Sequence, residues 1–305
     1  MTIDNDTSEY GWETSYQDVC ARGIQYGYGE VDRRYGPTNM DPLPFHELKH
    51  TVCVTDRTVR ILSAIRSVDS SLVNSDDIFF GALMASHHDL IQAFVYKGEG
   101  LNRVRIPEHM NTEAQSHEML AEYMRQREKI FSEDDITFAG RALFATVCNR
   151  DPRSGRITQP FVEQSMWKAV DLGRSIFIIP ALAMADLGDA GMSPSVIRCG
   201  NAMFRERYRG ITTALAAGEI NTFSQAERRF IRDMMIEWAH DQIAFVHDRK
   251  SAFEEQCRSY LPKEVHGAIR ALFPYFDYSE SAVRERYTSF TNDASLLEMV
   301  QSMGY

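Results

Sequence analysis

Cysteine is scarce in this sequence, and its five copies are scattered along the chain. Cys20, Cys53, Cys148, Cys199 and Cys257 are odd in number and show no CxxC spacing. This pattern argues against a disulfide framework and against a structural zinc site built from thiolates. It is typical of reduced thiols, and we therefore expect a cytoplasmic protein.

Long hydrophobic runs are also missing. The longest, residues 176–185, has ten residues and contains Pro180, whereas a helix that crosses a membrane needs about 20. Residues 1–6 contain two aspartates and no apolar core, so they do not resemble a signal peptide. We expect no membrane partner.

Positive charge is in deficit. The chain has 33 Lys and Arg against 43 Asp and Glu, which gives a formal net charge of −10. This balance argues against general binding of nucleic acids, although it remains compatible with a local basic pocket. The P-loop, the GxGxxG loop and the GxSxG nucleophile elbow are absent as well, which removes three common signatures of nucleotide-binding proteins and hydrolases.

Alternating strand patterns, internal repeats and low-complexity tracts are not found, whereas apolar residues recur at helical spacing through most of the chain. We therefore predict an all-α fold. Residues 1–44 are expected to form a polar tail and an arm rich in aromatic residues and glycine, with an ordered loop over 20–44. The main helical domain is expected over 45–215.

Residues 216–305 are expected to form a C-terminal helical extension. Ser224 and Glu227 have the spacing of a capping box, which predicts the start of a long helix that continues to about Tyr260. A homo-oligomer could form through such a helix.

Several ionisable residues stand where the surrounding pattern predicts burial. His50 shares a helix face with His46, His88 and Asp89 follow an apolar run, and Asp186 ends the uncharged run 176–185. Buried ionisable groups need a partner or a metal ion. Each residue taken alone also fits a structural role, as a core histidine bonded to the backbone or as an aspartate that meets water at a helix end.

The order His50, His88-Asp89, Asp186 resembles the H…HD…D signature of the HD-domain superfamily of metal-dependent phosphohydrolases. The segments that carry the resemblance are Phe45-His46-Glu47-Leu48-Lys49-His50-Thr51, Ala82-Leu83-Met84-Ala85-Ser86-His87-His88-Asp89 and Ala183-Met184-Ala185-Asp186. The resemblance covers about residues 45–215 and implies an HD-type helical bundle.

The resemblance further implies that His50, His88, Asp89 and Asp186 bind one divalent metal ion, with Mn, Fe, Mg and Ni as candidates. The implied reaction is hydrolysis of a phosphate ester or anhydride by metal-activated water, with Asp89 taking part in catalysis. The implied partner is a small phosphorylated molecule, with nucleotides among the candidates.

A phosphohydrolase also needs cationic and proton-donating groups. The segment after the His-Asp pair offers several, and we expect His117, and after it His109, to act as the general acid. The same segment could equally be a solvated surface loop. The residues expected to bind substrate are Lys97, Arg103, Arg105 and His46.

Two other classes stay open. An HD-type non-haem di-iron oxygenase has a similar first motif, but its second iron needs additional histidines. Between Asp89 and Asp186 the chain has only His109 and His117, which disfavours a second ion. A non-catalytic HD-fold sensor or scaffold would keep the fold, and the number of bound metal ions would separate the three classes.

Overall fold

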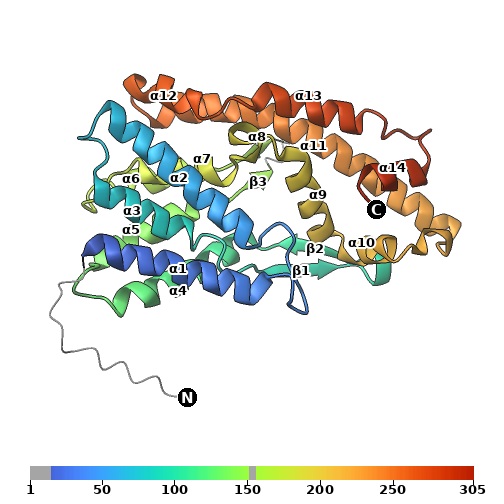
Figure 1. Ribbon diagram of the computed structural model, residues 1–305, viewed down its shortest axis with the longest axis horizontal. Helices are drawn as coiled ribbons and strands as arrows, with labels where there is room; N and C mark the ends of the chain where they lie inside the picture. The colour runs from blue at the N-terminus through green and yellow to red at the C-terminus, as the bar shows by residue number, and fades with distance from the viewer. Residues whose placement is uncertain (1–14, 151–155) are drawn as a thin grey trace, which may run out of the picture.

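The chain folds into a predominantly helical structure. The computed structural model describes residues 15–150 and 156–305, with only the backbone of His109 and Arg150. The structure is 67% helical and 4% strand, so the predicted all-α class is confirmed (Figure 1). No helix in the described ranges has the length and apolar character to span a membrane.

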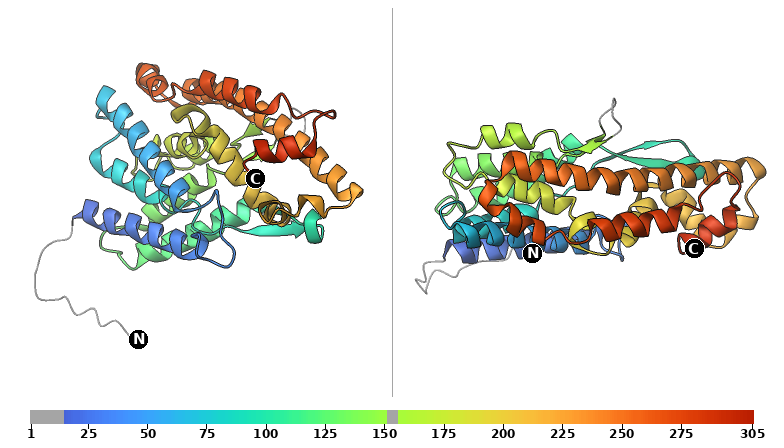
Figure 2. Two further views of the ribbon diagram at one scale, coloured as in Figure 1. Left: turned by 45° about the vertical axis from the view of Figure 1, so that its right-hand side comes forward. Right: turned by 90° about the horizontal axis from the view of Figure 1, so that it is seen from above.

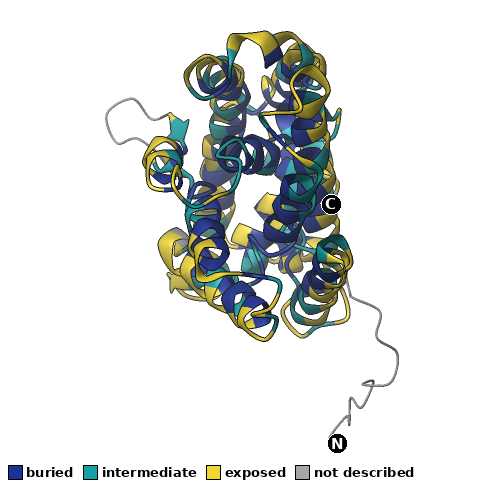
Figure 3. Cartoon of the chain, turned by 90° about the vertical axis from the view of Figure 1, so that its left-hand side faces the viewer, coloured by how far each residue is buried: buried dark blue, intermediate teal, exposed yellow. Residues whose placement is uncertain are grey.

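The N-terminal half is a bundle in which α2 packs against both α3 and α7, and α5 packs against α4 and α7. Buried residues face the spaces between these helices, and exposed residues cover their outer faces (Figure 3). The helices are α1 (Tyr16–Tyr35), α2 (Leu48–Val68), α3 (Ser75–Ala85), α4 (His109–Arg125), α5 (Glu133–Phe144), α6 (Val162–Trp167) and α7 (Ile178–Asp186).

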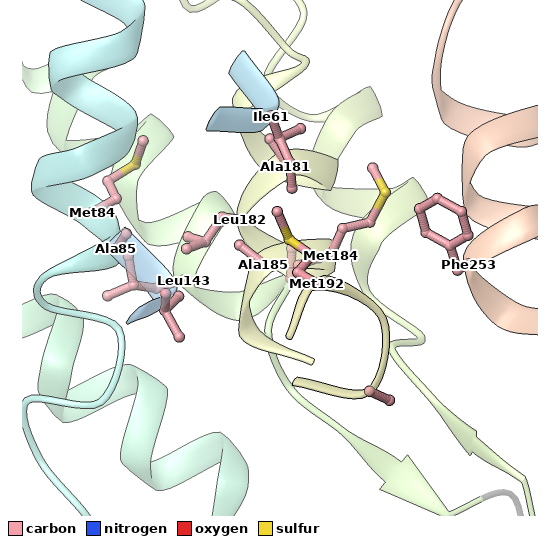
Figure 4. Packing of buried hydrophobic residues seen from close by; sticks show 14 of the residues in the cluster. Ile61, Met84, Ala85, Leu143, Ala181, Leu182, Met184, Ala185, Met192 and Phe253 are labelled. Carbon is pink, nitrogen blue, oxygen red and sulfur yellow. The ribbon is translucent and has the colours of Figure 1, made fainter. Parts of the chain in front are cut away.

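Helix α7 forms the centre of the core because residues 178–185 are all apolar and all buried. Their small side chains at Ala181, Ala183 and Ala185 let neighbouring helices approach closely. Figure 4 shows Leu182 and Ala185 between Leu143 on one side and Phe253 on the other. The core is thus continuous from α5 to the C-terminal helices.

The C-terminal part is built on the long helix α11, which runs beside α13 (Figures 1 and 2). Ser224 accepts from the backbone of Glu227, whose carboxylate accepts from the Ser224 backbone in return, so the predicted capping box is confirmed. The elements are α8 (Asp189–Met192), α9 (Val196–Arg207), α10 (Arg209–Ala216), α11 (Gln225–Tyr260), α12 (His266–Ala271), α13 (Phe276–Tyr287), α14 (Leu296–Ser302) and the 3-10 turns Gly100–Asn102, Glu219–Asn221 and Lys263–Val265.

The prediction of an ordered loop over residues 20–44 is wrong for most of that range, because α1 continues to Tyr35. Glycine disfavours a helix in isolation, but here it allows close helix packing. A Cβ at Gly23 would meet Leu83 Cδ1 at 2.5 Å, and a Cβ at Gly27 would meet the Ser86 carbonyl oxygen at 2.6 Å. The glycines therefore let α1 lie directly against α3.

Two short antiparallel hairpins interrupt the helices. Strands β1 (Phe94–Lys97) and β2 (Val104–Pro107) pair with Phe94 opposite Pro107, and β3 (Asn149–Arg150) pairs with β4 (Ile157–Thr158). Strands of two to four residues are too short for a recognisable alternation of apolar and polar residues. The first hairpin reaches as far as α10.

Candidate metal centre

The four residues that resemble metal ligands come from three separate elements. His50 lies in the first turn of α2, and Asp186 is the last residue of α7. His88 and Asp89 lie in the turn that follows α3, which ends at Ala85, rather than on the helix itself as expected. This turn is held by backbone hydrogen bonds, including those from His87 to Met84 and from Leu90 to His87.

The ligand atoms of these residues all lie within 4.8 Å of one another. Nε2 of His88 lies 3.1 Å from Asp89 Oδ2, and Nε2 of His50 lies 3.3 Å from the same oxygen. Each Nε2 also lies 3.5 Å from Asp186 Oδ1. Within the part of the chain that the structure describes, this is the group of His, Cys, Asp and Glu side chains whose arrangement could hold a metal ion.

The donor set fits a divalent ion. Nε2 of His50 and Nε2 of His88 are buried and have no hydrogen-bond partner, as expected of atoms that face a ligand position. Nδ1 of His88 donates to the Ala85 carbonyl oxygen at 2.7 Å, which fixes the ring and leaves Nε2 toward the carboxylates. Imidazole nitrogens with carboxylate oxygens suit Mn, Fe, Co, Ni or Zn.

Without an ion, the imidazoles and carboxylates of the cluster stabilise each other's charged forms. Burial opposes protonation of His88, but the nearby carboxylates of Asp89 and Asp186 raise its pKa well above the ordinary value. Burial opposes ionisation of Asp186, yet the nearby imidazoles of His50 and His88 lower its pKa to about 2. At neutral pH the carboxylates are therefore ionised, and the protonated His88 must release its Nε2 proton before it can bind a cation.

His46 stands beside this cluster and is held by Glu206. Its Nδ1 lies 2.5 Å from Glu206 Oε1, and its Nε2 lies 3.9 Å from Asp89 Oδ2. The other oxygen of Glu206 accepts from the backbone N–H groups of Phe45 and His46. Burial opposes protonation of His46, but Glu206 and Asp89 raise its pKa to about 9.

A cavity of about 340 Å³ opens beside Asp89 and Asp186. It lies between the first hairpin, α4, the second hairpin, α9 and α11, so it brings together both parts of the chain. Its walls include His46, Phe94, Arg105, Glu113, Cys148, Cys199, Glu206, Trp238 and Phe245.

Arg105 is the predicted substrate-binding arginine that lines this cavity. Its Nε donates to the Tyr96 hydroxyl at 3.2 Å, Nη2 is bound to Asp41, and the buried Nη1 has no partner. Lys97 and Arg103 lie exposed on the same hairpin and do not line the cavity. Arg103 instead stacks over the Tyr96 ring, 4.0 Å from its centroid.

The structure does not bring His117, the expected general acid, to the cluster. Its Nε2 donates to the Ile136 carbonyl oxygen at 3.0 Å, and its ring lies against Gly140, where a Cβ would be 2.9 Å away. His117 therefore joins α4 to α5. His109 begins α4, and its side chain lies outside the described residues.

Glu113 takes the place beside the cavity that was expected for His117. It lies one turn earlier on α4, is 4% exposed, and its Oε2 has no hydrogen-bond partner. Burial raises its pKa to about 8, and the charges of Asp89 and Asp186 act in the same direction. The sequence carried a signal for the burial of Glu113, since this residue lies seven positions before the core residue Leu120 and therefore on the same helix face.

Comparisons of the chain with models of known protein families, with curated proteins and with solved structures gave no match.

Proposed function

We propose that this protein is a metal-dependent phosphohydrolase of the HD-domain type, acting on a phosphate ester or anhydride of a small molecule. The observation that carries the proposal is the convergence of His50, His88, Asp89 and Asp186, with ligand atoms within 4.8 Å, at the wall of a cavity. Ionised carboxylates next to oriented imidazoles suit a divalent ion. A bound ion would polarise the phosphoryl group and acidify the attacking water.

The residues around the cluster supply the remaining groups for hydrolysis. Asp89 orients the water and accepts its proton as the water oxygen bonds to phosphorus. The bond from phosphorus to the leaving oxygen then breaks, and Glu113, which keeps its proton because its pKa is about 8, donates that proton to the leaving group. His46, held by Glu206, offers an N–H to a phosphoryl oxygen.

Elemental analysis of protein purified without added metal tests the proposal. We expect about one divalent ion per chain, its loss in Asp89→Ala and Asp186→Ala, and its retention in the control Asp171→Ala, which removes an exposed aspartate. A screen for phosphate release should then find activity that the first two variants lack.

Other metal contents would favour the other classes. About two irons per chain would favour the di-iron oxygenase, and no metal after addition of Mn would favour a sensor or scaffold. An intact ion without phosphate release from any ester or anhydride would also contradict the proposal.

A further inference from the structure

Four of the polar side chains around the cavity are already bonded within the protein. These bonds leave the four side chains fewer free donors and acceptors for hydroxyl groups of a ligand. The engaged side chains are Thr146, which donates to Leu143, Cys148, which donates to Thr146, Asp189, which is bound to Arg57, and Glu206, which is bound to His46.

Many of the other side chains that line the cavity are apolar. Phe45 and Phe94 come from the N-terminal part, and Met203, Trp238 and Phe245 come from α9 and α11. Flat aromatic side chains favour an apolar or aromatic partner that can stack or pack against them. The organic part of a ligand in this cavity should therefore be compact and apolar.

Arg105 gives the same cavity an anion-binding group. Arg105 and Arg209 both contact the single carboxylate of Asp41, so these three side chains carry one uncompensated positive charge. The Arg105 side chain is 4% exposed and its Nη1 lacks a partner. Since its guanidinium lies 5.6 Å from the centroid of the Phe94 ring, the free donor stands next to the apolar wall.

We propose that the ligand of this cavity is a phosphate monoester of a compact apolar or aromatic alcohol. Arg105 Nη1 binds its phosphoryl oxygens, and Phe94 and Phe245 contact its organic part. This inference adds a substrate class to the proposed function, and the hydrolysis of such an ester rests on that function. The binding preference itself does not depend on turnover, because Arg105, Phe94 and Phe245 are not among the candidate metal ligands.

Calorimetric titration with two stable phosphonates tests the preference. Phenylphosphonate and methylphosphonate carry the same charge and differ in their organic part, and both are titrated into metal-free and Mn-loaded protein. We expect phenylphosphonate to bind about tenfold more tightly, from the apolar area it buries. Phe245→Ala should reduce this preference, whereas equal affinities, or no binding of either probe in both forms of the protein, would overturn the proposal.

The role of Arg105 is tested with charge-matched variants. Arg105→Gln should weaken both phosphonates by about tenfold or more, since it removes a charge-assisted donor, while Arg66→Gln, which removes an exposed arginine of α2, should bind like wild type. If Arg105→Gln does not fold, Arg105→Lys keeps the charge beside Asp41. It should still bind both phosphonates more weakly than wild type, because an ammonium group cannot form the paired hydrogen bonds of a guanidinium group. Unchanged binding in the folded variant would overturn the assignment.

The two proposals fail separately. Phenylphosphonate binding that depends on Arg105, in a protein that takes up no metal, would contradict the hydrolase and support the ligand class. Metal-dependent phosphate release that is equally fast from phenyl phosphate and glycerol phosphate would support the hydrolase and contradict the ligand class.

Discussion

Nε2 of His88 lies 3.1 Å from Oδ2 of Asp89, although the two residues are neighbours in the chain. In a continuous helix their side chains would point about 100° apart. They converge because α3 ends at Ala85 and both residues lie in the turn that follows it. The convergence of these side chains thus depends on the conformation of this turn as well as on the identity of the residues.

Metal binding should stabilise the fold, since the cluster joins α2, the turn after α3 and the end of α7. We expect Mn to raise the melting temperature of the EDTA-treated protein, with about 2.7 kcal/mol gained at a free concentration of 100 times Kd. Asp186→Asn should abolish the shift, and the surface variant Asp171→Asn should keep it. Thermal melts with and without Mn measure this, and an equal shift in both variants would contradict it.

Glu113 should make the metal-free protein less stable as the pH rises. Its pKa is raised to about 8 from the ordinary 4.5, so above pH 4.5 the unfolded chain releases a proton that the folded chain retains. The contribution of the protonated Glu113 carboxyl group to the free energy of unfolding is fully present below pH 4.5. It is lost as the pH rises through 8. We expect Glu113→Gln to flatten the dependence and to gain about 1–3 kcal/mol at pH 8.

Urea denaturation at several pH values measures this effect. Glu118→Gln on the same helix is the control, since Glu118 is exposed and its removal should leave the pH dependence as in wild type. A Glu113→Gln profile that is parallel to the wild-type profile would contradict the assignment.

The convergence of His50, His88, Asp89 and Asp186 was predictable because their chemistry conflicts with their surroundings. Asp186 ends ten residues without charge, and His88-Asp89 follows a similar apolar run, so a shared partner was the simplest way to offset their burial. The order of the residues also resembles the H…HD…D signature, and that resemblance stays a prediction. Their convergence could be expected from the sequence, but the distances could not.

The groups around these four residues were harder to predict. His117 and Glu113 lie four residues apart on α4, and the sequence does not show that α5 covers His117 and leaves Glu113 at the cavity. Helix α1 was missed for a related reason, because the value of its glycines lies in contacts with α3. Such effects depend on residues distant in the sequence, whereas helix propensity is local.

The ion pair of the buried Arg57 with the partly buried Asp189 should hold the segment after Asp186 against α2. Arg57 Nη2 is bound to Asp189, and its Nη1 donates to the Ala185 carbonyl oxygen at 3.3 Å. We expect Asp189→Ala to lower the free energy of unfolding by about 3–5 kcal/mol, since it leaves a buried arginine without its charge partner.

A second pair on α2 gives the control for this effect. Arg60 lies 3.8 Å from Asp56, with both side chains about half exposed or more, so Asp56→Ala should cost less than about 1 kcal/mol. Chemical denaturation of both variants measures the difference. Equal losses would mean that the Arg57 pair contributes no more than a surface pair.

Two glycines of α1, only two residues apart, should respond in opposite directions to alanine. A Cβ at Gly27 would lie 2.6 Å from the Ser86 carbonyl oxygen and 3.0 Å from the His87 ring, whereas a Cβ at Gly29 would have no atom within 4 Å. Gly27→Ala should therefore cost about 1–3 kcal/mol through overpacking, and Gly29→Ala should gain about 0.5–1 kcal/mol from helix propensity.

Because Ser86 precedes the His-Asp turn, Gly27→Ala should also weaken Mn binding, which Gly29→Ala should leave unchanged. Denaturation and Mn titration of the two variants test both effects, and a stable Gly27→Ala protein with normal Mn affinity would show that the approach of α1 to α3 does not support the metal site.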